Sequence, residues 1–292
     1  MSDLSNSTNP LCKMIPSHTA DNGSMLNSII MLSIGVVGTI LHVIGIFLLG
    51  KLDRHVFNQR SLLISLAGIE MTMAITLAIS MILVITEQNT QILHYFTCLL
   101  VSANESFYCM MLVILVDRFL EVYLHLRYRM SYVFQYKIYF CIACWIFGLL
   151  TFCACIVTSQ FICFPRIFNL LWYQVYPVEN VLILFLAIVV YGYLYLKWRQ
   201  SRRRVACMIG TQLLHQRRQF HIPFLILASF VVFIAIPDFI NETVDCVKES
   251  RIMNMIYPLN IVSDACIYIF AQHAVRAKLL TIMKRSCCME QN

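Results

Sequence analysis

Five acidic residues stand inside otherwise apolar stretches of the chain: Glu70, Glu105, Glu179, Asp238 and Asp264. An ionised carboxylate in the middle of a bilayer costs on the order of 2.5–3.5 kcal/mol on insertion scales, so an acid in such a stretch is a functional candidate. Two neighbouring carboxyl groups cannot both ionise cheaply unless a cation lies between them or one stays protonated. The chemistry to expect of these acids is therefore cation binding or proton sharing.

A second candidate is the triplet Asp117-Arg118-Phe119, which directly follows an apolar stretch. A fixed guanidinium at the end of a membrane helix can pair with the neighbouring acid in one state and reach a partner protein in another. The alternative is that Arg118 is one more positive anchor on the inner side of the membrane.

The high hydrophobic content of the chain indicates that membrane-spanning segments position these residues. Of the 292 residues, 60% are hydrophobic and 13% are charged, against roughly 45–50% and 25% in soluble domains. This excludes nucleotide-binding folds, zinc-finger arrays and secreted disulfide scaffolds. Seven apolar stretches are each long enough to cross about 30 Å of hydrocarbon as a helix, and they lack the alternation of spanning strands. They run from Asn27 to Gly50, Ser61 to Thr86, Leu93 to Val116, Ile138 to Thr158, Val175 to Leu196, Phe220 to Ile240 and Met253 to Gln272. The sequence thus predicts an all-α membrane protein with a seven-transmembrane helix bundle.

The positions of Lys and Arg predict the orientation. With the N-terminus outside, 18 of the 22 basic residues fall on the inner side, where positive loops are retained. We expect an extracellular tail over residues 1–26, a seven-helix domain over 27–272, and a cytoplasmic amphipathic helix and tail over 273–292. This plasma-membrane topology absorbs the net charge of +7, so no nucleic-acid partner is needed.

Several residues are candidates for modification. The sequons at Asn6, Asn22 and Asn241 all fall on the predicted outer side, which predicts N-glycosylation. Four cysteines, Cys12, Cys98, Cys163 and Cys246, also lie outside or near the outer face, where oxidising conditions allow pairing. No cysteine or histidine cluster has metal-ligand spacing, and no Ser/His or paired-Asp signature indicates an enzyme.

The order of these motifs along the chain resembles that of the rhodopsin-like G-protein-coupled receptors, over roughly residues 27 to 285. Asp117-Arg118-Phe119 is similar to the Asp-Arg-Tyr triplet that ends the third helix of that family. The remaining matches are Asn58 with Leu66-Ala67 and Glu70 in helix two, Trp145 in helix four, Tyr191 and Lys197 in helix five, Pro237 in helix six, and Asp264-Ala265-Cys266-Ile267-Tyr268 where Asn-Pro-x-x-Tyr would end helix seven.

Some positions depart from the family pattern. His42 stands where Asn is usual, Ala235 where a switch tryptophan is expected, and Ala265 where helix seven has its proline, so a backbone break there is not guaranteed. Cys98 lies 20 residues before Arg118, closer than the family cysteine that pairs with the second outer loop. These departures look like a divergent invertebrate branch. Helix seven contains no Lys, which excludes a retinal Schiff base.

The resemblance implies a receptor that binds an extracellular small ligand or peptide and activates a heterotrimeric G protein through an inner cleft at Arg118. The implied coupling and switch residues are Asp117, Arg118, Phe119, Tyr191, Pro237, Asp264 and Tyr268. The alternative is a seven-helix ion- or proton-coupled transporter, which the acids Glu70, Glu105 and Asp264 motivate. Against it, the chain shows no inverted repeat and no pair of Gly/Pro-broken helices.

The resemblance also implies binding sites. Glu70, Asn260 and Asp264 correspond to the family's allosteric sodium site, with a protonated, ion-free pair as the alternative. Glu105 and Asp238 could face an outer cavity and meet a cationic group of a ligand, whereas Glu179 is expected at the membrane interface.

The family's habit pairs Cys98 with Cys163, which leaves Cys12 and Cys246 for a second bridge. Residues 271–280 read as a short helix on the inner membrane surface, with membrane lipid as its partner. Cys287 and Cys288 resemble a palmitoylation site; the alternative is an unmodified basic tail.

Charge also predicts weak control of the resting state. In many members of the family an acid at the inner end of helix six pairs with the helix-three arginine in the resting state. This chain has no acid between Lys197 and His221, and it has Arg217 and Arg218 at that end of helix six. Arg118 is then expected to pair with Asp117 alone, and we expect measurable ligand-independent signalling that falls when Arg217 or Arg218 is changed to Glu.

The alternative is that apolar packing of helix six, through Phe224, Leu227 and Phe230, keeps the receptor shut without such an ion pair. Undetectable basal signalling, or a level that both charge reversals leave unchanged, would contradict the expectation.

Overall fold

The computed structural model describes residues 22–51, 60–86, 90–124, 136–161, 175–204, 224–243 and 256–271, which are almost entirely helical and contain no strand. The expected all-α class is confirmed for these ranges. The elements are α1 (Asn22–Gly50), α2 (Arg60–Ile85), α3 (Thr90–Leu124), α5 (Lys137–Phe161), α7 (Tyr176–Arg204), η4 (Val231–Ala235), α9 (Ile236–Thr243), α11 (Leu259–Cys266) and η6 (Ile267–Ala271). Residues 224–230 form a helical segment that runs directly into η4.

Apolar composition explains why these segments are helical. Within the described ranges, four helices are long and apolar enough to cross a membrane: Met25–Gly50, Arg60–Ile85, Gln91–Glu121 and Lys137–Thr158. Hydrocarbon offers the backbone no hydrogen-bond partners, so a spanning segment has to satisfy its own amides as a helix. Shorter apolar helices cover Val178–Tyr193, Phe224–Ala235 and Leu259–Phe270.

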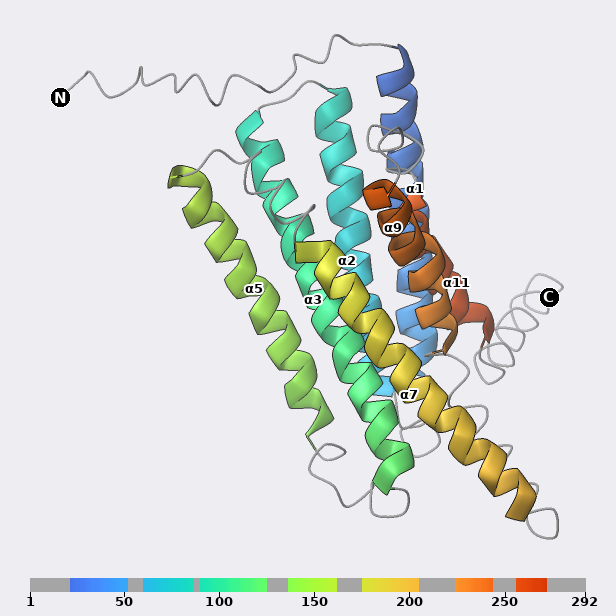
Figure 1. The fold of residues 1–292 in the computed structure, drawn as a ribbon. Helices are drawn as coiled ribbons and strands as arrows, with labels where there is room; N and C mark the ends of the chain where they lie inside the picture. Colours follow the sequence, from blue (N-terminus) through green and yellow to red (C-terminus); the bar gives the residue numbers. More distant parts are fainter. Residues whose placement is uncertain are drawn as a thin grey trace, which may run out of the picture.

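The helices run side by side as a bundle, with α5 at one edge and α1 with α11 at the other (Figure 1). Helix α3 packs against α2, α5 and α7, while α1 packs against α2, α11 and η6. The largest apolar cluster surrounds α3, where Phe107 and Met110 lie with Leu66 of α2, Phe230 and Tyr268. This core holds the polar side chains described below in fixed positions.

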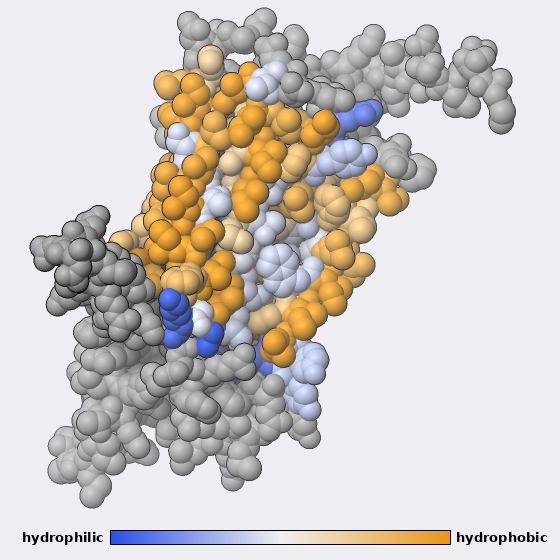
Figure 2. Space-filling model, turned by 180° about the vertical axis from the view of Figure 1, so that it is seen from behind, coloured by the Kyte–Doolittle hydropathy of each residue, from blue (hydrophilic) through white to orange (hydrophobic). Residues whose placement is uncertain are grey.

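The outer surface of the bundle is apolar. Hydrophobic side chains cover most of the described part of the face drawn in Figure 2. On α5, Leu149 and Leu150 are 60% and 62% exposed, and on α1 Ile40 is 55% exposed. So broad an apolar surface would drive aggregation in water and is suited to contact with lipid. The long apolar helices and this apolar surface agree with the expectation of a helical protein embedded in a membrane.

Two helices contain π-helical turns. In η4, the backbone N–H of Ile236 bonds to the carbonyl of Val231, one residue further back than in an α-helix. The next residue, Pro237, has no N–H and its ring clashes with the carbonyl four residues earlier, so the wider turn relieves both problems. Turn η6 directly follows α11, which contains Ala265. The described backbone stays helical from Leu259 to Ala271, so it shows a wider turn and not a break of the kind a proline causes.

Helices α3 and α5 approach closely at small residues. Ser102 Oγ donates to the carbonyl of Gly148 at 2.6 Å, and Ser106 Oγ lies 3.2 Å from the carbonyl of Cys144. A Cβ atom added to Gly148 would overlap Ser106 Oγ and lie 3.1 Å from the carbonyl oxygen of Ser102. Glycine is thus required at position 148 by the distance between the two helices.

Candidate functional site

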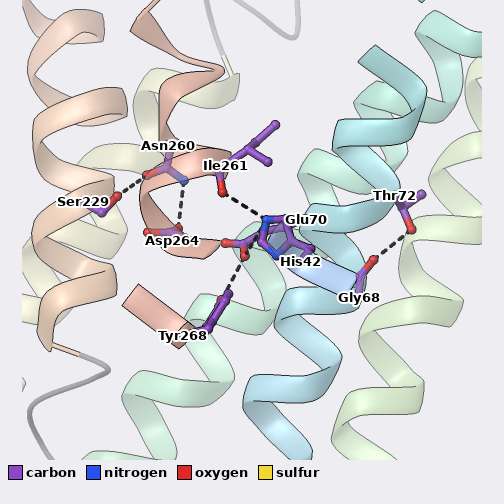
Figure 3. Close-up of polar contacts among 9 residues, drawn as sticks. All are labelled: His42, Gly68, Glu70, Thr72, Ser229, Asn260, Ile261, Asp264 and Tyr268. Atoms are coloured by element: carbon purple, nitrogen blue, oxygen red, sulfur yellow. Dashed lines mark hydrogen bonds and ion pairs between the residues drawn. The ribbon is translucent and has the colours of Figure 1, made fainter. Parts of the chain in front are cut away.

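A cluster of buried polar side chains lies between α1, α2, α11 and η6 (Figure 3). We call it the Glu70 cluster. His42 of α1, Glu70 of α2 and Asp264 of α11 are each 0% exposed. The other members are Ser229 in the segment 224–230, Asn260 of α11 and Tyr268 of η6, all buried. Polar groups removed from solvent this fully need partners inside the protein.

Hydrogen bonds connect most of the cluster. Ser229 Oγ donates to Asn260 Oδ1 at 2.9 Å, and Asn260 Nδ2 donates to Asp264 Oδ2 at 3.1 Å. From the other side, the Tyr268 hydroxyl donates to Glu70 Oε2 at 2.9 Å. These hydrogen bonds link the segment 224–230 to α11, and η6 to α2.

His42 completes the cluster from α1. Its Nε2 atom lies 3.0 Å from the carbonyl oxygen of Ile261 and 3.7 Å from Glu70 Oε2. Because both neighbours are acceptors, Nε2 has to carry the ring proton. The sequence marked His42 only as a departure from the family pattern, and its contact with Glu70 was missed.

The two acids of the cluster face each other. The carboxyl groups of Glu70 and Asp264 interact directly. Glu70 Oε1 and Asp264 Oδ1 are nevertheless buried with no hydrogen-bond donor among the described residues. The structure therefore brings together Glu70, Asn260 and Asp264, the three residues expected at a sodium site. It leaves carboxyl oxygens there that a proton or a cation would satisfy.

A second polar group, which we call the Arg118 cluster, lies between α3 and the start of α5. It contains Asp117, Arg118, Glu121 and Lys137. Arg118 bonds to both Asp117 Oδ2 and Glu121 Oε2, and Lys137 Nζ lies 2.9 Å from Asp117 Oδ1. The guanidinium is fully buried, and only the Glu121 side chain is partly exposed, at 18%.

The expectation that Arg118 pairs with Asp117 alone is wrong. Helix α3 continues past the predicted end at Val116 to Leu124, so Glu121, three residues after Arg118, projects from the same face of the helix. The structure also places Lys137 beside Asp117 as a second cation, a contact that the sequence did not indicate. Arg217 and Arg218 lie outside the described residues.

Three other predicted switch residues lie on three helices, with Phe119 on α3, Tyr191 on α7 and Pro237 on α9. Phe119 stacks on Tyr123 with ring centroids 5.7 Å apart and contacts Tyr193 of α7 at 5.6 Å. The Tyr191 ring lies 5.5 Å from that of Phe224, and its buried hydroxyl has no hydrogen-bond partner among the described residues. Pro237 is buried where η4 meets α9.

A second acidic pair crosses between α3 and α7. Glu105 is 6% exposed and interacts with Glu179, which lies in the first turn of α7. The sequence correctly predicted Glu179 near the start of its helix, and its place at the membrane interface stays a prediction. The sequence did not predict the contact of Glu179 with Glu105. Of the other proposed ligand residue, Asp238, only the backbone is described, in α9.

Cys98 is buried beside Val101 and Cys155 and forms no disulfide with any cysteine that the structure describes. Its sulfur lies 3.8 Å from His94 Nε2, and its expected partner Cys163 lies outside the described residues. We expect peptide mapping of unreduced protein from intact cells to recover Cys98 and Cys163 as one disulfide-linked pair, because both fall on the oxidising side of the predicted topology. Recovery of both as free thiols would refute the pairing.

The remaining modification sites are not tested by the structure. Asn22 begins α1 and Asn241 lies in the last turn of α9, but their side chains are not described. Outside the described residues lie Asn6, Cys12, Cys246, Cys287, Cys288 and the predicted amphipathic helix. Glycosylation, a second disulfide and palmitoylation stay predictions.

Models of protein families do not match the chain, and a search of curated proteins gives no significant match. The Glu70 and Arg118 clusters are the parts of the described structure that bear most directly on function.

Proposed function

We propose that the chain is a rhodopsin-like G-protein-coupled receptor of seven transmembrane helices, placed in the plasma membrane with its N-terminus outside. The observation that carries this is Arg118: it is completely buried in an apolar helical bundle and is ion-paired with its neighbour Asp117. A buried guanidinium held by two acids is suited to a switch, because it is stable only where those partners accompany it.

The mechanism follows from that arrangement. An extracellular ligand that binds one packing of the helices more tightly shifts the population toward it. In that state Arg118 leaves Asp117 and Glu121 and reaches the G protein in an inner cleft. The Glu105–Glu179 pair supports a ligand with a cationic group, since it places two acids between α3 and α7.

The experiment that tests the function is a panel of purified heterotrimeric G proteins added to the receptor in liposomes. We expect ligand-independent nucleotide exchange on at least one G protein and its loss in Arg118→Ala. Lys51→Ala is the matched control, because Lys51 is an exposed cation, packed over the Phe47 ring. Exchange that survives Arg118→Ala unaltered would contradict the proposal.

Sodium is proposed as an allosteric ligand of the Glu70 cluster. The carboxyl, amide and hydroxyl oxygens of Glu70, Asn260, Asp264 and Ser229 are the hard donors that such a cation takes. At a sodium concentration ten times its Kd, binding stabilises the protein by about 1.4 kcal/mol.

Exchanging sodium for N-methylglucamine should therefore lower the melting temperature of the purified protein. The shift should vanish in Asp264→Asn and persist in Glu105→Gln, which alters an acid outside the cluster. Equal melting temperatures in the two salts would instead favour the protonated, ion-free pair.

A cation-coupled transporter is the second candidate. It is favoured by two acidic pairs in separate parts of the bundle: Glu70 with Asp264, both buried, and the buried Glu105 with the half-buried Glu179. Proton or sodium flux into liposomes that is lost in both Glu70→Gln and Glu105→Gln would favour this function. The receptor proposal expects no such flux.

A further inference from the structure

Asp117 is shared between two cations on different helices. Its Oδ2 atom bonds to Arg118, the next residue of α3, and its Oδ1 atom lies 2.9 Å from Nζ of Lys137, the first residue of α5. The side chains of Asp117 and Lys137 are only 1% and 7% exposed. Solvent therefore screens these charges little, and each cation affects the hold of the other on the carboxylate.

The sign of this effect follows from Coulomb's law. Lys137 attracts Asp117 and repels Arg118, so its presence weakens the ion pair between Asp117 and Arg118. Glu121 does the opposite, because it bonds to Arg118 and holds the guanidinium at α3. The two neighbours thus act on Arg118 in opposite directions.

Without Lys137, freeing Arg118 would leave Asp117 with neither of these two cations beside it. Breaking a buried ion pair by removing one partner is strongly unfavourable, because the remaining charge is uncompensated. With Lys137 in place, Asp117 keeps a cation at 2.9 Å after Arg118 has moved. Lys137 therefore lowers the free energy needed to release the guanidinium.

We propose that Lys137 is a positioning residue that competes with Arg118 for Asp117 and thereby favours the released, partner-binding state of Arg118. This inference rests on the proposed receptor function. It assigns a role in the switch to the first residue of α5, with Glu121 as the opposing residue that keeps Arg118 at rest.

The signalling test compares two substitutions in the same cluster. We expect Lys137→Met to lower ligand-independent nucleotide exchange and Glu121→Gln to raise it, each by at least about fivefold, because even a well-screened surface pair is worth up to about 1 kcal/mol. Lys137→Arg should retain the wild-type rate, since it keeps the charge. If Lys137→Met raised the exchange or left it unchanged, the proposal would be overturned.

A second measurement does not depend on a G protein. Melting temperatures of purified Arg118→Met, Lys137→Met and the double variant should show a loss in the double variant that exceeds the sum of the single losses, because Asp117 then keeps neither cation. The excess should disappear when Asp117→Asn is added. Additive losses would overturn the shared carboxylate and the inference together.

The two measurements separate the inference from the function on which it rests. An excess loss of stability together with opposite effects of Lys137→Met and Glu121→Gln on exchange supports both. The same excess in a protein that activates no G protein overturns the receptor proposal and the signalling role of Lys137, while leaving Asp117 shared by two cations.

Discussion

Replacing Gly148 with Ala is expected to destabilise the bundle by about 1–3 kcal/mol, the usual cost of forcing an extra methyl group into a packed contact. The new Cβ would overlap Ser106 Oγ, and the backbone carbonyl of Ser102 at 3.1 Å leaves it no room to move away. Alanine is favoured over glycine in a helix by up to about 1 kcal/mol, so helix propensity opposes this loss without cancelling it.

The measurement is the melting temperature of detergent-purified protein together with its surface expression. Gly192→Ala is the matched control, because a Cβ there would meet nothing within 4 Å, and it should be neutral or mildly stabilising. In a Ser106→Ala background, which removes the overlapping hydroxyl, Gly148→Ala should cost less than in the wild type. A Gly148→Ala protein as stable as the wild type would show that α3 and α5 are not in this close contact.

Removal of the carboxyl group of Glu70 is expected to have a similarly large effect. Glu70→Ala leaves the Tyr268 hydroxyl without its acceptor at 2.9 Å, and an unsatisfied buried donor costs about 1–3 kcal/mol. The cavity left by the side chain adds to this loss. We therefore expect a total on the order of 3 kcal/mol, seen as a lower melting temperature.

Glu70→Gln is the matched control because its amide oxygen can still accept from Tyr268. It should be much closer to the wild type in stability while losing the stabilisation by sodium. Adding Tyr268→Phe to Glu70→Ala should cost little more, since the stranded donor is then gone. Equal destabilisation by Glu70→Ala and Glu70→Gln would argue against the hydrogen bond as the source of the effect.

Local spacing in the sequence accounts for part of the site. Asn260 and Asp264 are four residues apart on one helix, and the hydrogen bond between them forms at that spacing. The ion pair from Arg118 to Glu121 follows the same rule at three residues. The apolar stretch ends at Val116, before Arg118 and Glu121, so hydropathy alone did not place these two residues on one helix.

Contacts between helices could not be predicted in this way. Glu105 meets Glu179, and Lys137 meets Asp117, only because α3 is rotated so that these side chains face α7 and α5. One sequence without aligned relatives does not specify how a uniformly apolar helix is rotated about its axis. His42 illustrates this, since nothing in the sequence indicated its contact with Glu70, which depends on the approach of α1 to α2.

The close contact between α3 and α5 also bears on the order in which the helices assemble during biogenesis. Hydrocarbon gives helices no hydrophobic reason to associate, so small residues and interhelical hydrogen bonds drive their pairing. Consecutive helices α3 and α5 have both, in Gly148 and in the hydroxyls of Ser102 and Ser106. Because α3 and α5 precede α7 along the chain, these contacts can form before α7 is inserted. The pair can therefore form a template against which α7 and the C-terminal helices are added.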